Sequence, residues 1–332
     1  VLNDSTDAVS GNQLTAYPWA GWKDSVTKIV IGDGITGIGA KSFITWPNVT
    51  TVELGKGVET IGAGAFAQLQ KCSTFTVDNQ NASFKVEDGI LYNSDMSKLY
   101  YYPLTKTETT FSVPDSVMEL GYNAICRNAS LQSISFAGSN SLRLGYGSLF
   151  GNIALTTVNL YRDNATFDSL VFSGDNALNV VYCNTSEIKA AANKLMNDTQ
   201  SGAVALLKGG EYDKKEADYI YAVDSEGAII CGYEGNETVL VLPNELGEKA
   251  VTVIAANTFA NLNGNRNITK VTIPATVKSI EPNAFLGGKD YHNYDSTLTD
   301  ITILGRNVEI GSMAFARHQN LRIDMTAVTN LK

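Results

Sequence analysis

The fold of this chain is decided by two copies of one motif near its N-terminal end. Residues 26–43 read VTKIVIGDGITGIGAKSF, and residues 49–66 read VTTVELGKGVETIGAGAF. The two segments align without gaps, with a period of 23 residues from Phe43 to Phe66. Because a unit of this size cannot bury its apolar face alone, the repeat predicts a solenoid in which neighbouring units share one core.

Weaker copies of the motif continue along the chain. They begin at Thr110, Leu131, Leu155, Leu178, Thr238, Ile268 and Leu298. In each copy, alternating apolar and polar residues predict a short strand, and Gly or Pro ends it. The Ala-Phe pair that follows predicts an inward-facing ring on a short turn. We therefore expect an aromatic ladder along the core, with Ile125 replacing one ring. Its members are Phe43, Phe66, Phe150, Phe172, Phe259, Phe285 and Phe315.

The composition argues against several classes of protein. The chain has 332 residues and a formal net charge of −9 without clusters of Lys or Arg, which disfavours nucleic-acid binding. No apolar run approaches the roughly 20 residues of a membrane span. The four cysteines lack short metal-ligand spacings, so we expect buried free thiols. With only two histidines, the chain favours neither zinc binding nor histidine-based catalysis. We expect no catalytic residues, no metal and no cofactor.

The repeat resembles the BspA-like, or Treponema pallidum-type, leucine-rich repeat, L-x-x-[IV]-x-[IL]-P-x-[ST]-[VL]-x-x-I-G-x-x-A-F-x-x-C. The best matches are ITKVTIPATVKSIEPNAF (268–285) and VTTVELGKGVETIGAGAF (49–66). The resemblance implies a mainly β fold with short helices, in which a curved right-handed solenoid carries a parallel sheet. It also implies a surface protein of bacteria or protists that binds host proteins or other cells.

The repeats predict three segments. These are an N-terminal cap at 1–25, a first array at 26–205 with an insert at 78–108 and a closing helix at 186–197, and a second segment at 206–332 that starts with a hairpin at 219–233. In the cap, Tyr17, Trp19 and Trp22 are expected to cover the first repeat. Whether the two arrays form one solenoid or two bodies stays open. Because the chain starts at Val1 rather than Met, we expect a removed export signal.

One candidate binding surface is the exposed face of the predicted parallel sheet. The residues between the buried positions of the strands are Thr51, Glu53, Thr74, Thr76, Ser133, Ser135, Thr157 and Asn159. Such a face offers hydrogen bonds to a protein or glycan with little charge. The alternative is that threonine and serine stand there only because they suit an exposed sheet.

Aromatic residues provide a second set of candidates. Tyr92, Tyr100, Tyr101 and Tyr102 lie in the insert, and Tyr291, His292 and Tyr294 lie in the long loop 287–300. Alternation predicts that Tyr100 and Tyr102 point one way and Tyr101 the other, so that at least one ring is exposed. Exposed tyrosines suit sugar stacking or protein contacts. The alternatives are that the insert packs on the solenoid and that the loop is simply solvated.

These observations favour a non-enzymatic, cell-surface or secreted module for protein interaction or adhesion, with an extracellular or host protein as its partner. A carbohydrate-binding accessory module that uses exposed tyrosines is the first alternative. A structural spacer that displays other domains is the second. The oligomeric state stays open.

Overall fold

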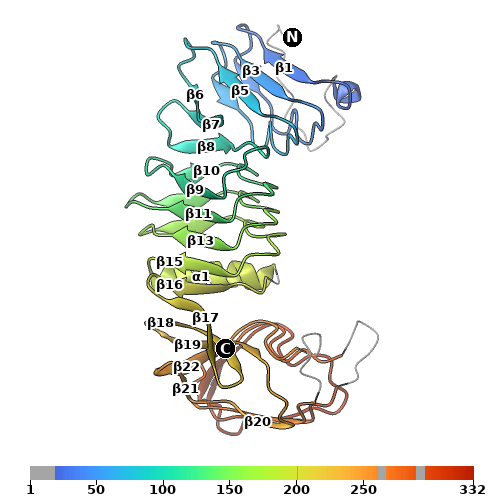
Figure 1. Cartoon of the computed structure of the whole chain (residues 1–332), viewed down its shortest axis with the longest axis vertical. Coiled ribbons are helices and arrows are strands. Elements are labelled where there is room, and N and C mark those ends of the chain that lie inside the picture. The colour runs from blue at the N-terminus through green and yellow to red at the C-terminus, as the bar shows by residue number, and fades with distance from the viewer. Residues whose placement is uncertain (1–18, 200, 261–266, 289–295) are drawn as a thin grey trace. The chain divides into compact units, whose positions relative to one another are not determined.

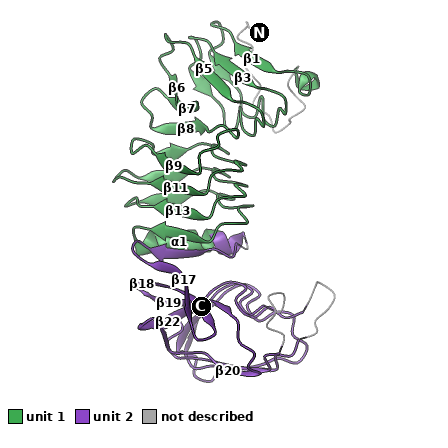
Figure 2. Ribbon diagram, viewed as in Figure 1, with its two compact units in different colours: residues 1–195 green, residues 196–332 purple. Residues whose placement is uncertain are grey.

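The computed structural model describes residues 19–199, 201–260, 267–288 and 296–332. The chain divides into two compact units, residues 1–195 and 196–332 (Figure 2). The division lies inside helix α1 (Ser186–Asp198). Both units consist mainly of short parallel strands, so the predicted mainly β solenoid with a parallel sheet is confirmed.

The first strands of the repeats in unit 1 pair in parallel within two consecutive sheets, which we together call the first-strand sheet. Its members are β1 (Lys28–Ile31), β3 (Thr51–Leu54), β5 (Thr74–Val77), β9 (Thr110–Val113), β11 (Ser133–Phe136), β13 (Thr157–Leu160) and β15 (Val180–Cys183). Equivalent residues pair across neighbouring strands, as Lys28 does with Thr51 and Thr51 with Thr74. Figure 1 shows β9, β11 and β13 following one another in this way. The sequence period is thus the pairing register.

A second, shorter strand in each repeat forms what we call the second-strand sheet. Its members are β2 (Gly37–Ile38), β4 (Thr60–Ile61), β8 (Lys98–Tyr101), β10 (Glu119–Leu120), β12 (Leu142–Leu144) and β14 (Ala165–Phe167). A 3₁₀ turn, Ala20–Trp22, precedes the first repeat. Trp19 stacks on Phe43 with ring centres 5.9 Å apart, but Trp22 is 64% exposed. Trp22 therefore does not cover the first repeat as expected, and Tyr17 lies outside the described residues.

The insert is an antiparallel hairpin, β6 (Phe84–Glu87) and β7 (Ile90–Asn93), placed between the two strands of the third repeat. Among the described residues, β5 does not pair with β9 and β4 does not pair with β8, so both sheets break here. The third repeat ends with Tyr102, whose N–H donates to the Ala124 carbonyl just as the Phe43 N–H donates to that of Ala65. Tyr102 therefore occupies the ring position of this repeat.

The aromatic ladder is present in part, and one expected member is wrong. Phe43 and Phe66 stack with ring centres 5.5 Å apart. In the fifth repeat, however, the Ile125 N–H donates to the Ser148 carbonyl, which makes the next residue, Leu149, the equivalent of the ring. Phe150 lies one residue after this position and packs beneath the Arg127 guanidinium instead.

Unit 2 repeats the two-sheet arrangement. Its strands are β16 (Val204–Leu207), β17 (Glu211–Glu216), β18 (Tyr219–Asp224), β19 (Gly227–Tyr233), β20 (Val239–Val241), β21 (Glu245–Leu246), β22 (Lys249–Ile254), β23 (Lys270–Ile273), β24 (Ser279–Ile280), β25 (Asp300–Ile303), β26 (Asn307–Ile310), β27 (Arg322–Asp324) and β28 (Asn330–Leu331). One sheet has the order β20-β23-β25-β27, and a second runs from the antiparallel strands β17, β18 and β19 through β22, β24 and β26 to β28.

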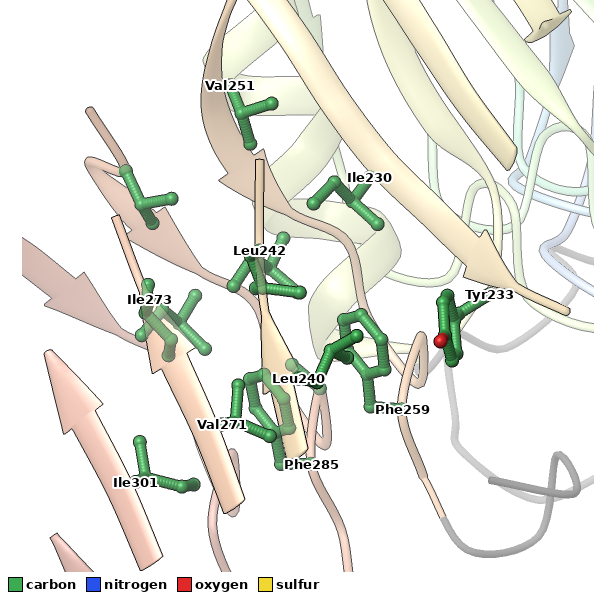
Figure 3. Packing of buried hydrophobic residues seen from close by; sticks show 14 of the residues in the cluster. Ile230, Tyr233, Leu240, Leu242, Val251, Phe259, Val271, Ile273, Phe285 and Ile301 are labelled. Atoms are coloured by element: carbon green, nitrogen blue, oxygen red, sulfur yellow. The ribbon is translucent and has the colours of Figure 1, made fainter. Parts of the chain in front are cut away.

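Between these sheets lies a continuous apolar core. Leu240, Val271 and Ile301 come from successive strands, and Phe259 and Phe285 stack with ring centres 5.0 Å apart (Figure 3). Each of these five side chains is buried. Because every core residue contacts its equivalents in adjacent repeats, the apolar surface of one repeat is covered only when the next is in place.

A polar ladder runs beside the core of unit 1, three residues after the ring positions. Its members Asn128, Asn152 and Asp175 are all buried. The Asn128 N–H donates to the Asn152 side-chain oxygen, and the Asn152 N–H donates to a carboxylate oxygen of Asp175. The Asn152 side-chain amide also donates to the Ile125 carbonyl. Backbone groups that the short strands leave unpaired are satisfied in this way.

The polar ladder ends at the carboxyl group of Asp175, which costs more free energy to bury than the amides of Asn128 and Asn152 when it is ionised. Asp175 is 4% exposed, and its second carboxylate oxygen has no hydrogen-bond partner. Burial raises the pKa of Asp175 from 3.8 to about 8. The folded chain thus keeps a proton that the unfolded chain releases, and the unfolding free energy falls as pH rises from about 4 to about 8.

Replacing Asp175 with Asn should remove this penalty, because an amide stays neutral and can donate as Asn152 does. We expect Asp175→Asn to stabilise the protein at pH 8 by about 1–3 kcal/mol. The gain should be small at pH 4, where the carboxyl is protonated in both states. Urea unfolding at the two pH values measures the difference, and a gain of equal size at both would contradict the assignment.

A left-handed residue recurs in most repeats, two positions before the ring. It is Lys41, Gly64, Asn123, Gly147, Leu170, Asn257, Asn283 or Met313. Glycine and asparagine tolerate this conformation, whereas other residues pay a steric cost of roughly 1–2 kcal/mol. Met313 has a φ of 56° and is 44% exposed, so it has little packing to lose.

We therefore expect Met313→Gly to stabilise unit 2 by about 0.5–1 kcal/mol, since the steric cost exceeds the entropy that glycine adds to the unfolded chain. The matched control is Met325→Gly, at an exposed methionine that does not have positive φ. It should destabilise by about the same amount. Thermal unfolding should show a higher midpoint for Met313→Gly and a lower midpoint for Met325→Gly. If both variants are destabilised, the positive φ of Met313 does not carry the expected steric cost.

Candidate functional site

The first-strand sheet presents the predicted polar residues in two groups. Thr51, Glu53, Thr74 and Thr76 lie on β3 and β5, and Ser133, Ser135, Thr157 and Asn159 lie on β11 and β13. Thr74 and Thr76 are exposed and the other six are half-buried. The break between β5 and β9 separates the groups into two sheets. The structure therefore brings together each set of four, but not all eight in one continuous sheet.

Hydrogen bonds and charges on this face are local. The Asn159 amide donates to the Ser135 hydroxyl at 3.0 Å, and Glu53 forms an ion pair with Lys28 at 2.7 Å. The rest of the predicted set is hydroxyl groups, which can donate and accept. This face can therefore hydrogen-bond a partner along neighbouring strands without a strong field of one sign.

Three of the insert tyrosines are not available as a binding surface. Tyr92, Tyr101 and Tyr102 are buried, and the Tyr101 hydroxyl donates to the carbonyls of Leu69 and Cys72. The expected alternation fails at Tyr102 because β8 ends at Tyr101 and Tyr102 turns into the ring position. Burial also raises the pKa of Tyr102 to about 12, so the phenol stays neutral. These rings pack the insert onto the solenoid.

Only Tyr100 of the insert tyrosines is half-buried, with its ring against the edge of Phe84. The other aromatic candidates, Tyr291, His292 and Tyr294, lie outside the described residues. Tyr100 leads to a site that the sequence analysis did not identify, because it lines a groove of about 230 Å³ on the second-strand sheet of unit 1.

Missing side chains create the floor of this groove. The residue that follows each second strand is Gly121 in the fourth repeat and Gly145 in the fifth. A Cβ atom on Gly145 would lie 2.5 Å from the Leu120 carbonyl oxygen, so no other residue fits there without a shift of the backbone. Continuing the strand register, Tyr100 of the third repeat lies beside Gly121 and Asp168 of the sixth lies beside Gly145, and both line the groove. The groove continues past Tyr100 to residues 61–66 of the second repeat.

One side of the groove is aromatic. Tyr122 and Tyr146, which directly follow the two glycines, stack with ring centres 5.0 Å apart and an interplanar angle of 12°. The Lys41 ammonium lies 5.2 Å from the centre of the Tyr122 ring. Tyr146 is 39% exposed, and Ser169 stands at the equivalent position of the next repeat. A serine is too short to cover a tyrosine ring, which agrees with the exposure of Tyr146.

The other side of the groove is a row of charges in alternating sign. Lys98 pairs with Glu119 at 3.0 Å, and Arg143 pairs with Glu119 at 3.0 Å and with Asp168 at 2.6 Å. The strand register explains the row, because Glu119 lies opposite both Lys98 and Arg143. Half-exposed pairs such as these contribute only about 0–1 kcal/mol each to stability. Their main effect is to hold donors and acceptors in place.

Sequence reasoning missed Tyr122, Tyr146 and the charged row because it followed each strand along the chain. The pattern that identifies these residues is visible only when equivalent positions of successive repeats are compared. There, two successive glycines stand beside two successive tyrosines, and Lys98, Glu119 and Arg143 share another column. Neighbouring repeats in a solenoid place equivalent residues side by side, so such columns become surfaces.

His318 is held by two hydrogen bonds. Its Nε2 donates to the Phe285 carbonyl at 2.6 Å, and its Nδ1 bonds the Ser296 hydroxyl at 2.6 Å. It stands three residues after the ring position of its repeat, as Asn152 does in unit 1. Burial lowers the pKa of His318, which favours the neutral ring. His318 therefore has a structural role.

The described parts of the chain contain no cluster of metal ligands, and neither Cys72 nor Cys126 has a lowered pKa. They contain no group of three or more His, Cys, Asp and Glu side chains that could hold a metal ion. All four cysteines are free, and burial raises the pKa of Cys72 to about 11 and of Cys126 to about 12. In the same residues, no helix is long and apolar enough to span a bilayer.

Comparisons with known proteins agree with this architecture. The sequence matches the family described as "BspA type Leucine rich repeat region" in six copies, over residues 21–105 and 100–198. The match covers more than half of the chain, which therefore belongs to this family. This finding confirms the resemblance seen in the repeats. Among curated proteins, no sequence matches significantly.

Solved structures of bacterial leucine-rich repeat proteins are similar to this chain. One from Eubacterium ventriosum is 17% identical, with 97% of this chain and 85% of that one covered and a TM-score of 0.35. The pneumococcal vaccine antigen PcpA is 14% identical, and a leucine rich cell surface protein from Faecalibacterium prausnitzii is 15% identical. Each of these two alignments covers 86% of this chain and 62% of the other protein, with a TM-score of 0.36.

The glycine floor of the groove leads to a test by substitution. Gly145→Ala should destabilise unit 1 by about 1–3 kcal/mol, because its methyl group would overlap the Leu120 carbonyl. Gly121→Ala is the matched control, since its Cβ would meet the Leu99 carbonyl oxygen at 3.2 Å and needs only a small adjustment. Urea unfolding should rank the two costs in this order. Equal costs would show that the floor is not constrained as described.

Proposed function

We propose that this BspA-type leucine-rich repeat protein is a non-enzymatic module, at the cell surface or secreted, that binds an extracellular or host protein. The observation that supports this proposal best is the polar face of the first-strand sheet in unit 1. Family membership supports a role in protein interaction, which leucine-rich repeats commonly have. A role in adhesion and a location outside the cell are parts of the proposal.

The chemistry of the face fits a protein partner. Its strands present hydroxyl and amide groups at a regular spacing, and buried side chains beneath them hold the backbone still. A partner that lies across these strands meets a row of preorganised donors and acceptors, so that little side-chain entropy is lost on binding. The face lacks a strong charge of one sign, so that affinity should depend weakly on salt.

The test is a binding screen of the whole chain against immobilised extracellular matrix proteins. Thr76→Arg and Ser135→Arg place a large charged side chain on each of the two halves of the face without touching the core. At least one of them should weaken binding about tenfold or more, because it blocks close approach and leaves a charge to be desolvated. The expected readout is a higher dissociation constant with an unchanged unfolding midpoint.

The control variant is Thr166→Arg, which makes the same change on β14 of the second-strand sheet, where Thr166 is exposed. It should bind as the unmodified chain does. If a matrix protein binds all three variants equally well, the first-strand face is not the site. If no protein on the panel binds, a structural spacer becomes the better interpretation.

A further inference from the structure

We propose that the groove on the second-strand sheet of unit 1 binds a neutral saccharide, with one sugar ring stacked on the open face of Tyr146. This site lies on another sheet than the surface invoked above, and it does not depend on that proposed function. Four features of the groove carry the inference: its aromatic side, its balanced charges, its unused donors and its size.

The two stacked tyrosine rings on the aromatic side end at Tyr146, which offers a flat surface for a ligand. Tyr122 is covered on one side by Lys41 and on the other by Tyr146, so only the outer face of Tyr146 is free for stacking. The C–H-rich face of a pyranose packs well on such a ring, because tyrosine combines apolar area with a hydroxyl at its tip. In the next repeat, the position equivalent to Tyr146 holds Ser169. Its small side chain leaves room for the pyranose ring where a third tyrosine would otherwise lie.

The charged side favours a ligand without net charge. Lys98, Glu119, Arg143 and Asp168 contribute two charges of each sign, and they neutralise one another along the row. Such a row attracts neither a phosphate nor an acidic or basic peptide over distance. It does offer charge-assisted hydrogen bonds at close range, which suit the hydroxyl groups at the rim of a sugar.

Arg143 lines the same groove as Tyr146 and supplies hydrogen-bond donors to it. Its two terminal nitrogens reach Glu119 and Asp168, and in the part of the chain that the structure describes its remaining N–H groups are not used by other side chains. Its guanidinium is fixed by both carboxylates, so it is already oriented before a ligand arrives. A planar group held in this way can donate to two neighbouring hydroxyls at once.

The size of the groove agrees with a single ring and not with a larger ligand. Its volume of about 230 Å³ is below the roughly 300–1,000 Å³ of sites that enclose drug-sized molecules. Its lining extends from residues 61–66 of the second repeat to Asp168 of the sixth, and the glycine floor keeps it open between them. The groove therefore fits the end of a glycan or one residue of a chain that continues into solvent.

The experiment measures binding of the whole chain to immobilised neutral oligosaccharides of glucose, galactose, mannose and xylose, with a sulfated oligosaccharide alongside them. At least one neutral sugar should bind. Tyr146→Ala should lower its affinity about tenfold or more, because the stacking platform is lost. Tyr146→Phe keeps the ring and should retain binding within about threefold, since it loses at most one neutral hydrogen bond.

A second variant blocks the site without removing a side chain. Ser169→Tyr extends the tyrosine column by one ring, which should cover Tyr146 and lower the affinity to the same extent as Tyr146→Ala. Tyrosine already occupies this position in the two preceding repeats, so the variant should keep the unfolding midpoint of the unmodified chain. Trp22→Ala removes an exposed ring outside the groove and should leave binding unchanged.

Three results would overturn the proposal. The first is that no neutral sugar binds the unmodified chain. The second is that a sugar binds Tyr146→Ala and Ser169→Tyr with unchanged affinity. The third is that the sulfated oligosaccharide binds more tightly than every neutral one and is lost in the same variants, which would mean that charge and not stacking governs the site.

Discussion

Backbone pairing between successive repeats, at a register equal to the sequence period, is the constraint on which the rest of this structure depends. It places every buried residue next to its equivalents in the adjacent repeats, as Val271 lies opposite Leu240 and Ile301. A change at one position therefore acts on three repeats. The same register produces the polar ladder, in which Asn152 joins the repeats before and after it. Stability in such a chain is a property of neighbours and not of single units.

Where this pairing is interrupted, the surface changes. The hairpin β6–β7 enters the third repeat, and both sheets of unit 1 break beside it. Buried tyrosines of the insert fill the space, with Tyr101 bonded to carbonyl groups of the preceding repeat. The groove spans this break, with residues 61–66 on one side of it and Tyr100 on the other. The insert thus matters for function through the shape that it creates, whereas its own tyrosines are mostly used for packing.

The sequence predicts the repeat, the strands and most of the ring positions well, because these depend on apolar periodicity. It fails at single-residue shifts. Leu149 and not Phe150 takes the ring position, although both side chains are large and apolar. Tyr102 looks like the continuation of an alternating strand, but the strand ends before it. Composition cannot separate these alternatives, because only the hydrogen bonds to the next repeat decide which residue points inward.

The sequence by itself determined the solenoid, its family and its polar first-strand face, since a repeated pattern of apolar residues has one way to be buried and neighbours must stack in register. Only the tertiary structure decided which tyrosines are hidden, that Asp175 is buried with an unpartnered oxygen, and that Tyr122 and Tyr146 stand beside a row of balanced charges. These features join residues more than 20 positions apart, and their chemistry comes from proximity between repeats. The local sequence determines the structure of one repeat, whereas a binding surface forms only when several repeats stack.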